Sequence, residues 1–249
     1  MIGGTLLKIS IICVYNNLYQ LEECLLKSLK TQNIDYELIL IEGVPNKFAS
    51  CSAALNYGVK KSSGDILIFS HQDIVLKRND ELEQFAEYII KMPEGTIVGS
   101  AGAIETKKIN VGNYTSGTKI NNELVWNYLS PVQVACVDEC FFGMKKSTYN
   151  RHKFDEELCD DWHLYAVEQC LFHRRQQGKV FVYPSQIHHL SQGKISRKYM
   201  NGLVKLVDEY KKDFKYIWTT CYKLRANYFY VRILRMLWIL NRKIRNKDM

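Results

Sequence analysis

The sequence lacks the paired cysteines that mark structural zinc sites and disulfide frameworks. Its eight cysteines are scattered, and no two of them form a C-x-x-C pair. Cys136 and Cys140 lie four positions apart in a strand-like region, but no second pair accompanies them. We therefore expect no zinc site, and free, mostly buried thiols in a reducing cytoplasm.

Targeting signals and repeats are missing as well. No basic segment, apolar segment and small-residue cleavage site follow one another near the start, so we expect a cytoplasmic protein. There are no internal repeats and no low-complexity linker. With 249 residues, of which 47% are hydrophobic and 24% charged, the chain is expected to be globular, with one large domain or two small ones.

Positive charge is concentrated at the end of the chain. The formal net charge is +8, but residues 194–249 carry 15 Lys/Arg against 4 Asp/Glu, a net of +11. The preceding residues carry 19 Lys/Arg against 22 Asp/Glu, a net of −3. A weakly acidic body with a basic tail indicates that the tail meets a polyanion, either anionic lipid or nucleic acid.

The basic tail contains an amphipathic segment rich in aromatic and aliphatic residues. In residues 221–240 the longest runs without a charge are six residues, too short to span a bilayer. The arginines have helical spacing, and an apolar stripe lies nearby: Arg225, Arg232, Arg235 and Arg242, with Tyr228, Val231, Leu234 and Trp238. Such a helix fits either a membrane surface or packing on the domain with snorkelling arginines. We expect no nucleic-acid binding, because no binding module accompanies the charge.

The first 75 or so residues alternate between strand and helix patterns. Apolar, β-branched runs predict strands at 6–14, 36–41 and 65–70, and helical periodicity predicts helices at 18–30 and 50–61. This order predicts a parallel sheet with helices on its faces. The strand ends should then meet at one edge of the sheet and line one crevice. The residues at these ends are Tyr15-Asn16, Glu42-Gly43 and His71-Gln72-Asp73.

The rest of the chain continues the α/β pattern. Gly64 suits the position after a helix end, and 105–131 resembles a long loop with short strands at most. We predict helices at 79–91 and 160–176, the latter closed by Gly178, and strands at 96–104, 132–137, 140–144, 180–183 and 186–190. This organisation indicates a catalytic-type domain at 1–195 and a basic helical region at 196–249.

Several polar residues have both a chemical and a structural interpretation. Asp73 follows a buried strand, where ligands bind in open α/β sheets, but it could equally cap the next helix. Asp160 and Asp161 could be a catalytic pair or ordinary acids at a helix start. His188 and His189 could ligate a metal or lie in the core, and Lys194 could contact phosphate or belong to a solvated face.

The order of these motifs resembles glycosyltransferase family 2, whose members have the GT-A fold. The resemblance runs from about residue 9 to 193. Ser10 to Asn16 looks like the first strand of the family, and Ala53 to Asp65 looks like its helix-to-strand segment. His71-Gln72-Asp73 stands at the D-x-D motif, as in a bacterial branch of such proteins. Phe154-Asp155-Glu156 resembles the F-D-E turn, Asp160-Asp161 the E-D pair, and His188 the late metal-binding histidine.

The resemblance implies a mixed, mainly parallel α/β sheet flanked by helices and followed by a helical tail. It implies an inverting transferase that moves a sugar from a nucleoside-diphosphate sugar, first of all a UDP-sugar, to a hydroxyl acceptor. Asp161 would be the general base and Asp160 would orient it or touch the acceptor. Asp73 and His188 would hold Mn²⁺ or Mg²⁺, which neutralises a diphosphate leaving group.

The same resemblance implies a nucleotide site and a cellular role. The nucleotide would contact Tyr15, Asn16, Glu42, Asn56, His71 and Gln72, with Lys60 and Lys194 near the ribose or phosphates. The acceptor would be a glycan or a lipid-linked group in surface polysaccharide or glycolipid synthesis. The protein would be cytoplasmic, and could be peripheral on the anionic inner face of the membrane.

Two other functions stay open. A non-catalytic sugar-nucleotide-binding protein of the same fold is one, because His71 replaces the first acid of the metal motif. A nucleotidyltransferase of similar topology is the other. That class needs a glycine-rich phosphate loop near the first strand, and the residues after Tyr15 offer none.

Overall fold

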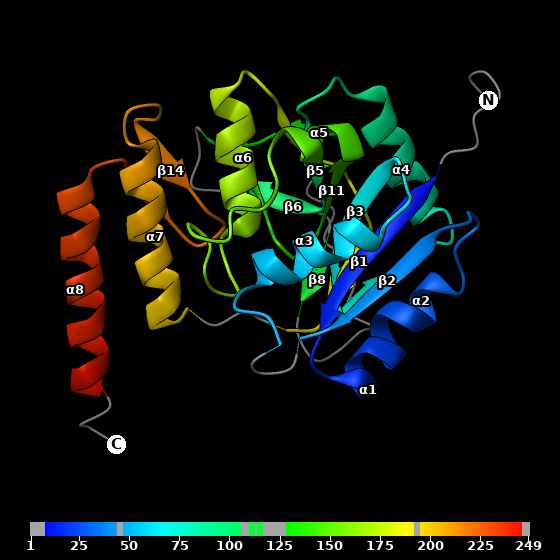
Figure 1. Cartoon of the computed structure of the whole chain (residues 1–249), viewed down its shortest axis with the longest axis horizontal. Coiled ribbons are helices and arrows are strands. Elements are labelled where there is room, and N and C mark those ends of the chain that lie inside the picture. Colours follow the sequence, from blue (N-terminus) through cyan, green and yellow to red (C-terminus); the bar gives the residue numbers. More distant parts are fainter. Residues whose placement is uncertain are drawn as a thin grey trace.

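The computed structural model describes residues 8–43, 47–105, 110–112, 114–116, 128–191 and 195–245. Its centre is a seven-stranded sheet with the order β2-β1-β3-β11-β5-β12-β9. The strands are β1 (Ile9–Tyr15), β2 (Glu37–Glu42), β3 (Ile66–His71), β5 (Ile97–Gly99), β9 (Val132–Gln133), β11 (Phe141–Lys145) and β12 (Val180–Val182). Figure 1 shows helices on both faces of this sheet. The mixed, mostly parallel α/β architecture confirms the fold class predicted from the sequence.

The first three sheet strands bring their carboxyl ends to one edge. β1 pairs in parallel with both β2 and β3, so that Tyr15 lies opposite Glu42 and Val14 lies opposite His71. The first crossover is a continuous helical segment made of α1 (Leu18–Gln20), a π-helical stretch η1 (Leu21–Leu26) and α2 (Lys27–Leu29). The second is α3 (Cys51–Lys61). The predicted βαβαβ order is therefore confirmed.

Two apolar cores lie on opposite faces of the sheet because successive strand residues point to opposite sides. In β1, Ile9 and Ile11 face one core and Ile12 faces the other. The first core includes residues of η1 and of α4 (Glu81–Lys91). The second is larger and includes residues of α3, α6 (Tyr165–Arg175) and α7 (Arg197–Tyr210).

Two three-stranded sheets contain the strands that follow β3 and β5 in the chain. Their strands are β4 (Ile74–Leu76), β6 (Ala101–Ala103), β7 (Asn110–Gly112), β8 (Tyr114–Ser116), β10 (Cys136–Val137) and β13 (Ile187–His189). The strand expected at 96–104 is divided at Ser100, whose N–H and hydroxyl both donate to the carbonyl of Phe141 at 3.0 and 3.2 Å. The chain leaves the central sheet at this point. The strand expected at 132–137 is likewise divided into β9 and β10.

The helix expected from residue 160 begins later, at Tyr165. Leu164 precedes it in the left-handed region, with φ 74°, a conformation that leucine rarely adopts. Asp160 and Asp161 therefore lie in a turn before α6 and do not cap it. Asp73 caps no helix either, since α4 is preceded by Asp80. At the other end of α6, Gly178 donates its N–H to the carbonyl of His173 at 2.8 Å.

The C-terminal part shares the core of the preceding residues. In this part, α7 is followed by the hairpin of β14 (Tyr216–Trp218) and β15 (Lys223–Arg225), and then by α8 (Tyr228–Arg245). The short helix α5 (Lys146–Arg151) lies earlier in the chain, after β11. The buried side of α7 belongs to the same core as β1 and β3. No helix among the described residues has both the length and the apolar character that crossing a bilayer requires.

Gly64 has a different role from the one expected. The helix α3 ends at the extended residue Ser62, and the structure requires no left-handed residue at position 64. Instead, a Cβ at Gly64 would lie 2.5 Å from Ser10 Oγ and 2.6 Å from Ser10 N, because the chain passes closely over β1 as it enters β3. The Gly64 N–H donates to Ser10 Oγ at 2.7 Å.

Gly64→Ala should therefore destabilise the protein by about 1–3 kcal/mol through overpacking against backbone. Chemical denaturation measures this free energy of unfolding. Gly202→Ala in α7 is the matched control, because its new Cβ meets only the end of the flexible Leu164 side chain and alanine favours a helix. Equal stabilities for the two variants would contradict the steric role of Gly64.

Candidate active site

A cavity of about 520 Å³ opens at the carboxyl ends of the parallel strands. Tyr15 and Asn16 line it from the end of β1, and Gly43 lines it after β2. His71 at the end of β3 and the following Gln72 and Asp73 also line it, as do Glu139, Trp162 and Tyr165. The crevice predicted from the order of strands is therefore present, and its size falls within the range of about 300–1,000 Å³ typical of ligand sites.

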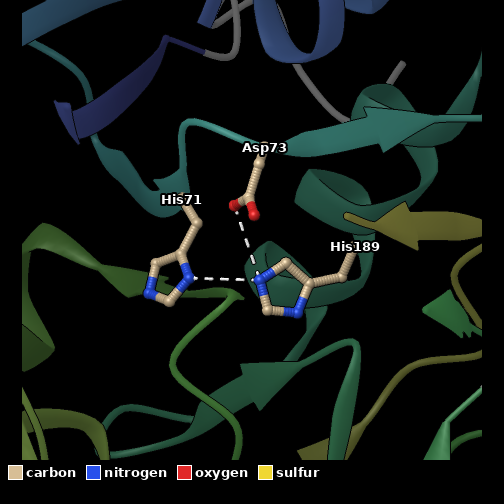
Figure 2. A group of neighbouring side chains, drawn as sticks. All are labelled: His71, Asp73 and His189. Carbon is tan, nitrogen blue, oxygen red and sulfur yellow. Dashed lines mark hydrogen bonds and ion pairs between the residues drawn. The ribbon is translucent and has the colours of Figure 1, made fainter. Parts of the chain in front are cut away.

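Three potential metal ligands meet beside this cavity. His71, Asp73 and His189 each offer an atom within 4.8 Å of the others. His189 Nε2 lies 3.5 Å from Asp73 Oδ1 and 3.4 Å from His71 Nδ1, as Figure 2 shows. Asp73 is 4% exposed, and the two imidazoles are partly buried. Residues from two distant parts of the chain thus form one compact group.

The pairing of β4 with β13 holds this group together. The antiparallel register sets His189 opposite Ile74, next to Asp73. Beyond this pair, the N–H of Leu190 donates to the backbone carbonyl of Asp73 at 3.1 Å, and the N–H of Ser191 donates to Asp73 Oδ2 at 3.0 Å. Asp73 is therefore tied to the segment carrying His189 through both its backbone and its side chain.

Burial and mutual contacts shift the ionisation of the group. Burial, and then the neighbouring charge of His189, lower the pKa of His71 to about 4, so His71 is a neutral imidazole near pH 7. Burial alone would raise the pKa of Asp73. The hydrogen bond and charge of His189 and a hydrogen bond from the Ser191 side chain outweigh it and bring the pKa below the usual aspartate range. Asp73 is therefore a carboxylate at neutral pH.

His188, which the sequence analysis expected beside Asp73, lies outside this group. Its side chain is fully buried, and its Nδ1 lies 2.5 Å from the hydroxyl of Thr115. His188 and His189 are adjacent on β13, so their side chains leave opposite faces of the strand. His189, not His188, lies beside Asp73, and His71 completes the group.

Gln72 and Asn16 line the cavity but hold two strand ends together. Gln72 Oε1 accepts from the backbone N–H groups of Asn16 and Asn17, each at 2.9 Å. Its Nε2 donates to Asn16 Oδ1 at 3.0 Å and to Gln20 Oε1 at 3.2 Å. Gln72 therefore links the end of β3 to the turn after β1.

Asn56 lies away from the cavity lining. Its side-chain nitrogen donates to the carbonyl of Phe154 at 2.9 Å and to Glu156 Oε1 at 2.8 Å. Its oxygen accepts from Tyr149 Oη at 2.8 Å and from the N–H of Phe154 at 3.1 Å. Both ends of this buried amide are occupied, so the structure gives Asn56 the role of anchoring the turn around residues 154–156.

The other expected nucleotide residues differ in position. Tyr15 lines the cavity, whereas Glu42 is exposed at the neighbouring strand end and does not line it. Lys60 is exposed on α3. Lys194 lies outside the described residues.

The acidic pair turns toward α7. Asp160 Oδ2 accepts from Lys205 Nζ at 2.7 Å, and Asp161 Oδ1 lies 3.4 Å from Lys198 Nζ. Neither side chain lines the cavity, although the next residue, Trp162, does. The Asp161 carbonyl also accepts from the N–H of Cys51 at the start of α3, at 3.1 Å. Asp161 is thus at the rim, and Asp160 is an exposed residue that joins the turn to α7.

Glu139 is a cavity residue that sequence reasoning missed. Its Oε2 lies 3.5 Å from His163 Nδ1, and its buried Oε1 has no hydrogen-bond partner among the described residues. Burial raises the pKa of Glu139, and the hydrogen bond with Glu139 raises the pKa of His163. The signal in the sequence was the acidic pair Asp138-Glu139, which interrupts two apolar strand patterns.

The chain matches a family described as "Glycosyltransferase like family" over residues 10–218. A comparison with curated protein sequences found no match. Among solved structures, GalNAc-T7 with UDP, GalNAc and Mn²⁺ is 14% identical, with a TM-score of 0.63, and 84% of this chain and 49% of that chain are covered.

Two further structures have similar folds. The mannosyltransferase PcManGT from Pyrobaculum calidifontis, in complex with GDP-Man and Mn²⁺, is 12% identical with a TM-score of 0.54, over 84% of this chain and 65% of that one. TarS 1–349 from S. aureus is 12% identical with a TM-score of 0.54, over 83% and 66%. The chain therefore spans from half to two thirds of the length of these proteins.

The matched residues include all three strand ends, the cavity and the His71–Asp73–His189 group. The sheet with helices on both faces agrees with the GT-A architecture of the similar structures. The chain therefore belongs to the glycosyltransferase like family and has the GT-A fold.

Proposed function

We propose that this protein is an inverting glycosyltransferase that moves a sugar from a nucleoside-diphosphate sugar to a hydroxyl acceptor in surface polysaccharide or glycolipid synthesis. The observation that carries the proposal is the convergence of His71, Asp73 and His189 beside a cavity at the carboxyl ends of parallel strands. Open α/β sheets bind nucleotides at this position. Family membership supports sugar transfer as the chemistry.

The donor is proposed to lie along the strand ends. Tyr15 and Trp162 lie next to Gly43 in the cavity lining, and Asn16 also lines the cavity; the base and ribose would bind here. The diphosphate would then lie toward Asp73. A UDP-sugar is the first candidate, and a glycan or lipid-linked group is the proposed acceptor.

The donor set of the three-residue group suits a divalent metal ion. Two imidazole nitrogens and one carboxylate form a mixed nitrogen and oxygen site, which favours Mn²⁺ over Mg²⁺, since Mg²⁺ prefers oxygen ligands. His71, Asp73 and His189 would hold the ion. When bound, a divalent ion neutralises negative charge on a diphosphate leaving group.

Asp161 is proposed as the general base. Its carboxylate would take the proton of the acceptor hydroxyl while that oxygen attacks the anomeric carbon. The bond from this carbon to the diphosphate breaks on the opposite side, and the anomeric centre inverts. The rim position of Asp161, next to Trp162, supports this assignment. Asp160 is proposed to position this turn through its contact with Lys205.

Glu139 is a second candidate for the base. It lines the cavity itself, whereas Asp161 does not, and burial raises its pKa toward the range in which carboxylates act as bases at neutral pH. A base must be deprotonated to act. With Glu139 in this role, the acidic limb of the pH–rate profile would lie above the ordinary glutamate range, and activity would rise as pH increases through it.

A screen of nucleoside diphosphates by thermal shift tests the donor. We expect UDP with Mn²⁺ to raise the melting temperature more than GDP, ADP or CDP do, because ligand binding to the folded state stabilises it. EDTA should reduce the UDP shift. A protein that responds to no nucleoside diphosphate would contradict the proposal. Binding without sugar transfer or donor hydrolysis would favour the non-catalytic binder.

His189→Gln should weaken Mn²⁺ binding at least about tenfold, because it removes one of three proposed ligands. Electron paramagnetic resonance of free Mn²⁺ measures this directly and does not depend on turnover. The neighbouring change His188→Gln is the matched control and should leave Mn²⁺ affinity unchanged once circular dichroism shows that the variant is folded. A loss of Mn²⁺ affinity in His188→Gln, with normal affinity in His189→Gln, would assign the metal site to His188.

Asp161→Asn should lower the transfer rate by about two to four orders of magnitude, the usual contribution of a positioned base, with UDP binding retained. Glu139→Gln is the matched carboxylate-to-amide change and should have the smaller effect. Single-turnover assays together with UDP titrations separate chemistry from binding. A large loss in Glu139→Gln with near-normal turnover in Asp161→Asn would move the base to Glu139.

A further inference from the structure

One face of α8 packs on the protein. Val231 is fully buried, and Leu234 and Trp238 pack against the larger core. Arg235 Nε donates to Asn201 Oδ1 at 2.5 Å, and Arg242 donates to the carbonyl of Ile195 at 3.3 Å. Figure 1 shows α8 at the edge of the molecule alongside α7. The apolar stripe that the sequence suggested is therefore the side that contacts the domain.

The opposite face of α8 is also apolar, and it is exposed. Its residues recur at helical spacing and each is between 43% and 72% exposed: Phe229, Tyr230, Ile233, Met236, Leu237 and Leu240. They extend over about 17 Å of the helix, at 1.5 Å per residue. A contiguous apolar surface rimmed by charge marks an interaction site more often than a scattered set of exposed residues does.

The charged residues of α8 and of the segment just before it have one sign. Residues 214–247 contain nine Lys/Arg and no Asp or Glu. Arg225 and Arg232 are exposed near the start of α8, and Arg242 is exposed near its end. A partner that fits must therefore combine an apolar interior with a negatively charged surface.

We propose that the exposed face of α8 lies in the interface of an anionic phospholipid membrane. Its apolar side chains would enter the boundary between headgroups and acyl chains, and the exposed Arg225 and Arg232 would contact lipid phosphates. A second copy of the chain fits less well, because a symmetric contact would bring two helices of the same positive charge together. The complementary charge decides in favour of the lipid surface.

The placement of α8 relates this surface to the proposed site. Arg242 contacts Ile195, two residues before α7, and Lys198 in the first turn of α7 pairs with Asp161. The C-terminal end of α8 is thus near the segment that carries the proposed base. The membrane would then hold the cavity beside a lipid-linked acceptor, and this consequence rests on the proposed function. The lipid contact of α8 does not depend on that function.

Flotation of the full chain with vesicles tests the lipid contact. We expect the protein to float with phosphatidylcholine vesicles that contain phosphatidylglycerol, and to remain at the bottom with phosphatidylcholine alone. Raising the salt concentration should weaken binding, because salt screens the arginines. No flotation with the anionic vesicles would overturn the proposal.

Variants distinguish binding through the apolar face of α8 from non-specific binding through other exposed apolar residues. Ile233→Gln with Leu237→Gln should reduce vesicle binding at least about tenfold, since binding scales with the apolar area inserted. The control pair Leu40→Gln with Ile90→Gln changes residues of similar exposure on β2 and α4 and should bind like the wild type. Equal binding by both pairs would overturn the assignment to α8.

Two further measurements make each result interpretable. The UDP affinity measured without lipid should be the same for the α8 variant and the wild type. Loss of vesicle binding with normal UDP affinity then concerns the lipid contact alone, whereas absence of UDP binding in the wild type concerns the proposed function. Sedimentation velocity reports self-association. A wild-type dimer that becomes a monomer in the α8 variant, without vesicle binding, would assign the face to a second copy instead.

Discussion

The antiparallel pairing of β4 with β13 is the constraint on which the candidate site depends. It connects residues more than a hundred positions apart and places His189 beside Asp73. Hydrogen bonds from Leu190 and Ser191 to Asp73 extend the pairing by two residues and position the carboxylate. Because a strand register moves in whole residues, a slip of one position would replace His189 with its buried neighbour and break the group.

Several polar residues around the cavity serve the scaffold. Gln72 connects two strand ends, and Asn56 anchors the turn at Phe154. A buried amide without partners would cost free energy, so these side chains stay bound to the protein and restrict the shape of the site. For the same reason Glu139 stands out, because one of its oxygens is buried without a hydrogen-bond partner in the part of the chain that the structure describes.

The C-terminal helices contribute both to the large core and to an exposed apolar surface. α7 shares the large core with the central sheet, and one side of α8 packs against α7 and this core. The remaining side of α8 keeps an apolar surface that packing inside the chain does not use. Amphipathicity in the sequence could not distinguish a helix packed on the domain from one on a membrane, because α8 is apolar on both sides.

The order of strands and helices in the sequence determined the parallel sheet and the meeting of Tyr15, Gly43 and Asp73 at one edge. Local periodicity suffices for this, since it sets which elements form and parallel crossovers set where they end. Only the tertiary structure placed His189, and not His188, beside Asp73, because alternate strand residues face opposite sides and the pairing register selects which one faces the carboxylate. It also directed Asp160 toward Lys205 and brought Glu139 into the cavity, through contacts between segments that no local pattern encodes.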